Sequence, residues 1–250
     1  MRHRAKARLY VTEDLAAERT VGLEAGQAHY LRHVMRLGPG DPVALFNGRD
    51  GEWLARIDGF GRGWCSLMVE EQTRPQRPEP DLWLAFAPIK RARLDFLVQK
   101  AVELGASRLI PVMTRHTDVS RVNLDRIRTN VAEAAEQCER LTLPDVGEVR
   151  ALRDVLADWP ASRRLLLCAE AGPAEPVGQV LRSAAAESPA WGIMTGPEGG
   201  FATEELDAFG KLPFVTAISL GPRILRAETA ALAALSCWQS VLGDWHFDRV

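Results

Sequence analysis

The spacing of hydrophobic residues divides the chain into two parts with different patterns. In the first part, three short runs rich in β-branched and aromatic residues cover residues 43–46, 53–57 and 65–69. Glycine-containing turns separate them, including Asn47-Gly48 and Asp50-Gly51, and such dipeptides favour tight turns because glycine tolerates positive φ. Short strands joined by tight turns predict a small β-barrel or sheet, and a helical pattern at residues 28–37 precedes them.

A proline-rich stretch separates the two parts. Residues 72–80 (QTRPQRPEP) place three prolines in polar surroundings, and such a segment cannot continue a helix or a central strand. We therefore predict two domains, residues 1–74 and residues 75–250.

The second part alternates apolar strands with amphipathic helices. Continuous apolar runs, typical of strands buried on both faces, cover residues 82–87, 108–113, 165–169, 191–195 and 215–220. Helices are predicted from about residue 94 to Gly105 and at about 123–138, 176–186, 203–211 and 226–242, with Asn123 and Thr203 as N-caps. This alternation predicts an α/β fold with a mostly parallel sheet.

Composition narrows the function only slightly. The chain has 250 residues, 46% of them hydrophobic, and a net charge of -2, so any basic surface must be local. Its four cysteines show no CxxC spacing and its five histidines no HExxH spacing, so we expect mostly buried, reduced thiols and no metal. No run is long enough to cross a membrane and no signal peptide precedes the first strand, so a cytoplasmic protein without a membrane partner is expected.

Two glycine-containing loops follow predicted strands, residues 195–201 (TGPEGGF) and 220–226 (LGPRILR). Ligands in open α/β sheets bind at these strand ends. A plain strand-to-helix turn, with Thr203 as cap, is the simpler alternative for the first loop. Two Gly-Pro corners at two strand ends favour a ligand site for a flat, uncharged base such as adenine. A phosphate site is not indicated, because the glycines at 59, 61 and 63 lead into a predicted strand and not a helix.

The last predicted helix has an unusual face. Ala230, Ala233, Ala234 and Cys237 are small and lie on one side of it. The alternatives are tight packing onto the sheet, or close contact with other segments or a second subunit.

Five segments, in order along the chain, carry a resemblance to a known family. They are residues 28–57, 99–105 (QKAVELG), 136–140 (EQCER) with Pro144, 196–201 (GPEGGF) and 219–230 (SLGPRILRAETA). Together they resemble the SPOUT superfamily of RNA methyltransferases and, within it, the RsmE family, which methylates N3 of a uridine in 16S ribosomal RNA.

The resemblance implies the architecture, the cofactor and the partners. It implies an N-terminal PUA-like β-barrel that binds RNA, a C-terminal SPOUT domain with a deep trefoil knot, and a homodimer that acts on ribosomal RNA in the small ribosomal subunit. S-adenosylmethionine is the implied cofactor, held by three loops. The contacts expected there are Ala169, Glu170, Thr195, Gly196, Pro197, Gly199, Gly200, Leu220, Gly221, Ile224 and Leu225.

Methylation at N3 would require the enzyme to align the reactants and to handle the N3 proton. Positive charge near the uracil oxygens would stabilise the anion, so Arg226, and less strongly Arg223, are the catalytic candidates. The alternative is that either arginine pairs with Glu198 or Glu228 and braces the fold. No general base is obvious, and those two carboxylates are the ones to test.

Basic residues that could contact RNA phosphates occur in both parts of the chain. The alternative for each is a solvated charge. The candidates are Arg2, Arg4, Lys6, Arg8, Arg32, Arg36, Lys90, Arg91 and Arg93.

Three other functions are compatible with the pattern. One is a SPOUT methyltransferase with another target, such as transfer RNA. The second is a non-catalytic RNA-binding dimer. The third is an unrelated α/β enzyme for a nucleotide-like ligand.

Overall fold

The computed structural model describes residues 5–169, 172–184 and 190–246, and contacts divide the chain into two compact units. Unit 1 comprises Met1–Pro78 and Ala135–Leu143, and unit 2 comprises Glu79–Ala134 and Pro144–Val250. The segment Ala135–Leu143, placed by the sequence pattern in the C-terminal domain, groups with unit 1 because Arg8 donates to the Ala135 carbonyl (2.7 Å) and the Tyr10 N–H to Glu136 (2.9 Å). Local periodicity carries no sign of such long-range contacts.

Unit 1 is built on a five-stranded sheet with the order β1-β3-β4-β5-β2. The three predicted strands are present as β3, β4 and β5, whereas β1 and β2 were not predicted because Arg8 and Gly22 interrupt their short apolar runs. All neighbours pair antiparallel except β1 and β3. The strands are β1 (Ala7–Tyr10), β2 (Thr20–Leu23), β3 (Pro42–Phe46), β4 (Glu52–Gly61) and β5 (Trp64–Arg74).

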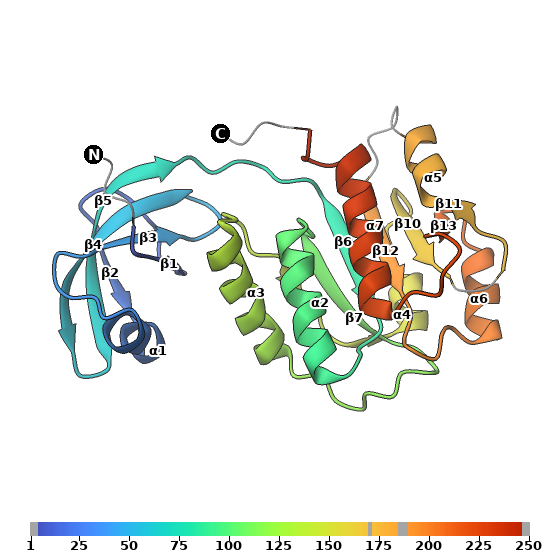
Figure 1. The fold of residues 1–250 in the computed structure, drawn as a ribbon, viewed down its shortest axis with the longest axis horizontal. Helices are drawn as coiled ribbons and strands as arrows, with labels where there is room; N and C mark the ends of the chain where they lie inside the picture. The colour runs from blue at the N-terminus through green and yellow to red at the C-terminus, as the bar shows by residue number, and fades with distance from the viewer. Residues whose placement is uncertain (1–4, 170–171, 185–189, 247–250) are drawn as a thin grey trace. The chain divides into compact units, whose positions relative to one another are not determined.

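The helix predicted at residues 28–37 was wrong at both ends. It begins earlier, as α1 (Ala25–His29) beside β5, and continues as the π-helix η1 (Tyr30–Val34) (Figure 1). Arg36 then adopts φ 57°, which is incompatible with a right-handed helix, so the pattern of apolar residues outlasts the helix itself.

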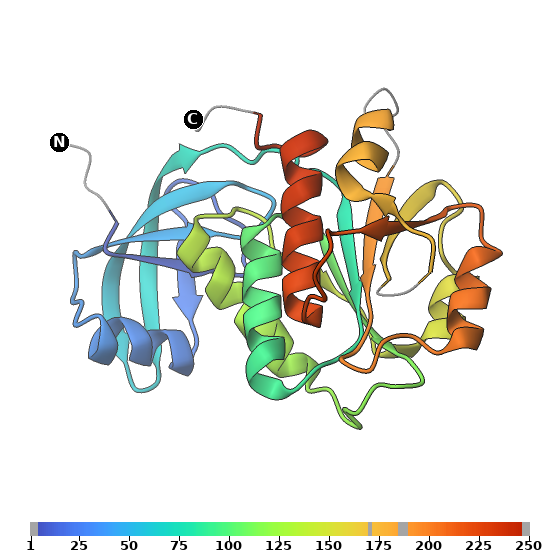
Figure 2. The ribbon, with the colours of Figure 1, turned by 45° about the vertical axis from the view of Figure 1, so that its right-hand side comes forward.

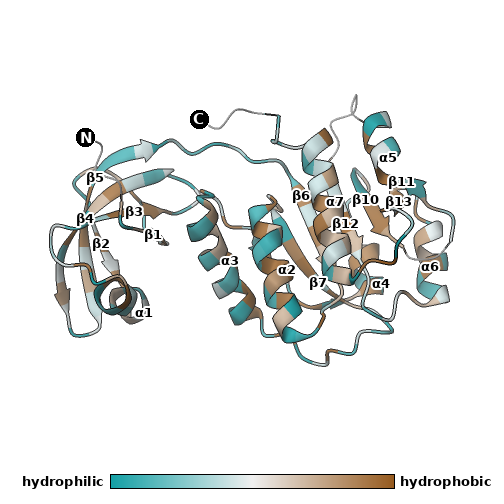
Figure 3. Cartoon of the chain, in the orientation of Figure 1, coloured by the Kyte–Doolittle hydropathy of each residue, from teal (hydrophilic) through white to brown (hydrophobic). Residues whose placement is uncertain are grey.

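Unit 2 contains the predicted parallel sheet. Its strand order is β11-β13-β10-β12-β6-β7-β8, and much of it is brown, or hydrophobic, in Figure 3. The five predicted apolar runs are β6 (Leu82–Phe86), β7 (Arg108–Met113), β10 (Arg163–Cys168), β12 (Ala190–Thr195) and β13 (Val215–Ser219). The two-residue strands β8 (Asp145–Val146), β9 (Arg150–Ala151) and β11 (Glu175–Pro176) are additions. The prediction of an α/β fold with a mostly parallel sheet is confirmed.

Helices connect these strands, and α2 and α7 lie side by side against the sheet (Figure 2). The short α4, which the sequence pattern did not predict, packs with α6 on a core that contains Trp159, Leu167 and Phe209. The helices are α2 (Arg91–Glu103), α3 (Leu124–Cys138), α4 (Leu152–Ala157), α5 (Val177–Ser183), α6 (Thr203–Gly210) and α7 (Ala227–Val241).

Two of the three predicted helix ends are confirmed. The Asn123 side chain accepts the Arg126 N–H (3.0 Å) at the start of α3, and Gly105, with φ 79°, follows the end of α2. Thr203 is not the N-cap of α6. Ala202 occupies that position and has no side chain to cap the helix, but its own N–H donates to the carboxylate of Glu205 (2.9 Å), which is the N3 half of a capping box.

The trefoil knot stays a prediction. Among the described residues no helix is both long and apolar enough to span a membrane.

Candidate functional site

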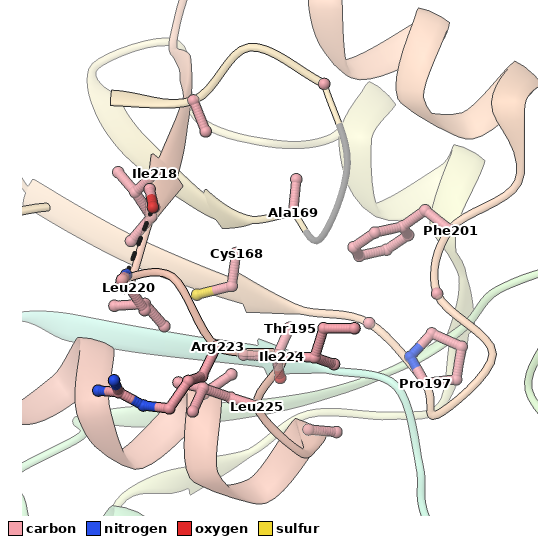
Figure 4. A pocket seen from close by; sticks show the side chains of 18 of the residues that line it. Cys168, Ala169, Thr195, Pro197, Phe201, Ile218, Leu220, Arg223, Ile224 and Leu225 are labelled. Atoms are coloured by element: carbon pink, nitrogen blue, oxygen red, sulfur yellow. Dashed lines mark hydrogen bonds between the residues drawn. The ribbon is translucent and has the colours of Figure 1, made fainter. Parts of the chain in front are cut away.

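The carboxyl ends of three strands meet at one edge of the unit 2 sheet. β10 lies between β12 and β13 and is parallel to both, so the loops that follow these strands converge. They enclose a cavity of about 500 Å³ (Figure 4). Every described residue that the sequence analysis expected at the cofactor lines it: Ala169, Thr195, Gly196, Pro197, Gly199, Gly200, Leu220, Gly221, Ile224 and Leu225. Glu170 lies outside the described residues.

The cavity also has lining residues that sequence reasoning missed. Some adjoin the named loops and could have been included on that ground, whereas Leu206 and Ala230 reach the cavity from helices, which only the tertiary structure reveals. The additional residues are Cys168, Gly172, Ala174, Phe201, Leu206, Ile218, Ser219, Pro222, Ala227 and Ala230.

The loop after β12 is shaped by its glycines. The Gly200 N–H donates to the Pro197 carbonyl (3.0 Å), and Gly200 has φ 67°. A Cβ added to Gly196 would lie 2.9 Å from the Phe201 ring, so only glycine lets this ring pack against the loop. The loop therefore presents backbone groups and one aromatic ring to the cavity.

The loop after β13 depends on one backbone conformation. Gly221 has φ 107°, which side chains rarely adopt, and its N–H donates to the Ser219 hydroxyl (3.4 Å). The next turn leaves Ile224 87% exposed at the cavity wall. Arg223 also lines the cavity, with its guanidinium group directed away from Phe201 (Figure 4).

The cavity wall is neutral apart from Arg223. Among the described lining residues there is no aspartate, glutamate or histidine. Burial raises the pKa of the Cys168 thiol to about 12, so this group stays protonated at neutral pH and is a poor nucleophile. Such a wall suits a ligand with a flat, uncharged ring and does not suit covalent chemistry.

Charged groups lie just outside the cavity. Arg93 of α2 contacts Glu198 (3.4 Å) in the loop after β12 and Glu228 (3.8 Å) in the first turn of α7. Glu228 is buried, and its Oε2 has no hydrogen-bond partner among the described residues. The alternative that Arg223 or Arg226 pairs with these carboxylates is wrong, because Arg93 occupies that place. Within the described chain, Arg223 and Arg226 are exposed and form no ion pair.

The remaining basic candidates differ in their surroundings. Arg8 is half-buried, with 11% of its side chain exposed, and each of its three guanidinium nitrogens already donates, to Glu52 (2.7 Å) or to a backbone carbonyl. Lys6 pairs with Asp41 at the surface (2.6 Å). Four candidates are exposed and make no ion pair in the described part of the chain: Arg32, Arg36, Lys90 and Arg91. Arg2 and Arg4 lie outside the described residues.

The thiols and a second cavity offer no alternative centre. No disulfide joins the described cysteines. Cys65 is buried, Cys168 and Cys237 are half-buried and Cys138 is exposed, so the expectation of mostly buried thiols held in full only for Cys65. A cavity of about 720 Å³ lies between α4 and α6, and its lining includes Leu152 of α4 and Leu212 just after α6. No strand-end glycine loop contributes to it. The described residues contain no cluster of three potential metal ligands.

Comparison with known proteins identifies the class. A family model described as an RNA methyltransferase domain matches residues 76–239, and one described as an RNA methyltransferase PUA domain matches residues 23–61. Fold and site together thus define an RNA methyltransferase.

Individual relatives narrow the class to a family. Ribosomal RNA small subunit methyltransferase E of Rickettsia conorii is 35% identical over 230 residues, which cover 92% of this chain and 93% of that protein. The protein of the same name from Bacillus subtilis is 29% identical, over 87% of this chain and 88% of its own. The chain belongs to the ribosomal RNA small subunit methyltransferase E family, as its motifs predicted.

Solved structures agree with this assignment. The crystal structure of ribosomal RNA small subunit methyltransferase E from Neisseria gonorrhoeae, bound to S-adenosyl methionine, superposes with a TM-score of 0.84 at 29% identity, over 96% of this chain and 99% of that one. A putative methyltransferase from Legionella pneumophila, in complex with the same cofactor, has a TM-score of 0.80 at 25% identity, over 95% and 98% of the two chains.

Proposed function

We propose that this protein transfers the methyl group of S-adenosylmethionine to N3 of a uridine in 16S ribosomal RNA, within an assembled or partly assembled small subunit. The observation that carries the proposal is the cavity at the ends of β10, β12 and β13, in a chain of this family. The names of the relatives support ribosomal RNA as the substrate, and the cavity supports S-adenosylmethionine as the cofactor.

The cavity fits the cofactor in size and in chemistry. Its volume of about 500 Å³ lies in the range usual for small-molecule sites. S-adenosylmethionine carries no phosphate, and the loops match no phosphate-binding motif. The adenine and ribose would lie against the backbone of residues 196–200 and 220–225, with Ala169 on a third side. When bound, the cofactor supplies an already activated methyl group.

The protein must then make N3 of the uracil nucleophilic. A cationic group beside the uracil oxygens would stabilise the N3 anion, and Arg226, with Arg223 as second candidate, has donors free for this in the described structure. Glu198 and Glu228 are the carboxylates that could accept the proton. Arg93 lies between them and holds the loop after β12 against α7.

Membership of this family also leads us to expect an RNA-binding domain and a homodimer. We expect unit 1 to bind RNA and the enzyme to act in the cytoplasm as a homodimer. Ile224, 87% exposed beside the cavity, is an apolar side chain that a second subunit could cover. A molar mass measured by light scattering that stays monomeric at all concentrations would contradict the dimer.

The decisive experiment is methyl transfer from labelled S-adenosylmethionine to small ribosomal subunits from a strain that lacks the enzyme, followed by nucleoside analysis. One new N3-methyluridine is the expected product. If transfer RNA is methylated instead, the proposed cofactor is correct and the proposed substrate is wrong. Absence of cofactor binding would favour a non-catalytic RNA-binding dimer.

A further inference from the structure

One face of the unit 1 sheet is open. Gly22 of β2 and Gly59 of β4 pair with Ser66 of β5 from either side, and a Cβ at either glycine would meet nothing within 4 Å. Trp64 and Met68 flank Ser66 along β5 and are 50% and 40% exposed. Alternate residues of a strand share a face, as do directly paired residues, so these five form one surface, the open face.

The indole of Trp64 has a fixed seat on this surface. Gly61 lies directly opposite Trp64 in the β4–β5 pairing. A Cβ at Gly61 would lie 1.9 Å from the indole nitrogen and 2.1 Å from a ring carbon, so the indole rests on the glycine backbone itself. One side of the ring is thus covered by β4, while half of the residue's surface stays exposed. An aromatic ring that is already oriented loses little entropy when a ligand stacks on it.

The turn beside Trp64 carries a positive charge without a partner. Arg62 lies between β4 and β5, is exposed, and forms no ion pair in the described chain. Arg19 and Arg49 of unit 1 pair with Asp14, and Arg56 pairs with Glu70 (2.8 Å), whereas Arg32 and Arg36, like Arg62, form no ion pair in the described chain. On the open face itself, the Ser66 hydroxyl donates to Asp58 (3.1 Å). Arg62 is therefore the charge available to an anion beside the indole.

We propose that the open face is a stacking site for an unpaired RNA base, with Trp64 as the platform and Arg62 on the neighbouring phosphate. The proposal rests on the proposed function, in that the substrate is RNA. Single-stranded RNA is bound by aromatic side chains that stack on bases and by cations that contact the backbone. The family model for an RNA methyltransferase PUA domain includes Gly59 and Gly61 but stops before Trp64.

Two other roles for this surface are distinguishable from RNA binding. A stable protein partner buries about 800 Å² on each side and needs an apolar centre, whereas Trp64 and Met68 are the two large apolar side chains of this face. An indole that covers a strand glycine can also serve only to stabilise the hairpin. In that case Trp64→Ala would lower the melting temperature and leave the affinity for RNA unchanged.

The test measures the affinity of the full-length protein for a labelled, unstructured oligouridylate by fluorescence anisotropy at one salt concentration. Trp64→Ala should raise Kd about tenfold, and Trp64→Phe should restore most of the affinity. Oligoadenylate should show the same loss, because stacking does not depend on the base. Duplex RNA should show none, because its bases are already stacked. An unchanged Kd for oligouridylate in Trp64→Ala, with or without a lower melting temperature, would overturn the proposal.

A second variant avoids any damage to the hairpin. Gly22→Val places a side chain in the open space, keeps Trp64, and introduces a residue that favours strands. Gly22→Val should weaken oligouridylate binding without lowering the melting temperature. Gly22→Ala, with its smaller side chain, should weaken the binding less. Arg62→Ala should reduce the slope of log Kd against log salt by about one. Wild-type affinity in Gly22→Val would contradict the proposal.

These outcomes are separable from those of the proposed function. Binding of S-adenosylmethionine should be the same in Trp64→Ala as in the wild type, because the cofactor cavity lies in unit 2. If ribosomal subunits accept no methyl group but Trp64→Ala still weakens RNA binding, the proposed substrate fails and the stacking site stands. If methyl transfer occurs and Trp64→Ala binds RNA normally, the stacking site alone fails.

Discussion

Arg8 in unit 1 and Arg226 in unit 2 have the same side chain in opposite surroundings. Arg8 has 11% of its side chain exposed, pairs with Glu52 (2.7 Å) and donates to the carbonyls of Ala135 and Arg140. Burial lowers the pKa of its guanidinium, and the hydrogen bond to Glu52 partly offsets this. Arg226, at the N-cap of α7, is exposed and has no ion-pair partner in the described chain.

The contrast shows how an arginine can be assigned a role. A buried guanidinium must have its donors satisfied, so a complete set of partners marks a residue that holds the fold together. An exposed guanidinium with free donors, such as that of Arg226 between the cavity-lining residues Leu225 and Ala227, is available to a substrate. Both arginines were functional candidates on sequence grounds, and only their partners separate them.

The largest effect should come from Arg8. Arg8→Ala leaves Glu52 with the Thr73 hydroxyl (3.0 Å) and, as its cation, only the more distant Arg74 (3.6 Å). Removal of one partner of a largely buried pair costs about 3 kcal/mol or more. Urea unfolding should show this loss, while Arg8→Lys, which keeps the charge but not the planar fork, should lose less. If Arg8→Ala left the unfolding midpoint unchanged but weakened RNA binding, Arg8 would be a phosphate contact and not a structural residue.

Arg226→Ala should act on chemistry and not on stability. If the guanidinium stabilises the uracil anion, its loss should lower the rate of methyl transfer about 100-fold or more, with binding of S-adenosylmethionine and the melting temperature unchanged. Arg223→Ala is the matched control and should have the smaller effect. Near-normal turnover in Arg226→Ala would remove this residue from the mechanism.

Replacement of Arg93 should lower stability by an intermediate amount, because Arg93 is partly exposed, like Arg226, and yet pairs with a carboxylate, like Arg8. It is 39% exposed, yet it contacts the buried Glu228. Arg93→Ala should leave that carboxylate without an ion-pair partner among the described residues and cost about 1–3 kcal/mol. Calorimetry should detect the loss, and Glu228→Gln in the same background should recover part of it. Unchanged stability with weakened RNA binding would instead support a phosphate contact.

Lys6 should have the smallest effect. It pairs with Asp41 at the surface, and exposed pairs contribute little to stability. The hydrogen bond from Lys6 holds the pKa of Asp41 below its usual value. The pair's contribution is therefore present above the ordinary pKa of an aspartate and is lost as the pH falls through the lowered pKa. Lys6→Ala and the wild type should show nearly equal melting temperatures at neutral pH and identical ones in strong acid. A large difference at neutral pH would contradict this assignment.

The sequence alone determined the main strands, the parallel α/β class and the two ligand loops. These features are local: a strand buried on both faces needs a continuous apolar run, and a Gly-Pro corner needs its own glycine. The family followed from five ordered motifs for the same reason, since each motif is a contiguous stretch of chain.

Only the tertiary structure decided which of these residues meet. Three contacts join segments that the local pattern treats as separate. Residues Ala135–Leu143 group with unit 1, Arg93 lies between Glu198 and Glu228, and the Trp64 indole packs on Gly61. β1 and β2 were missed because Arg8 and Gly22 interrupt their short apolar runs, and α4 was missed because its six residues are too few to show a helical period. Periodicity reports which side of an element is buried, whereas the partner that buries it is chosen by packing across the whole chain.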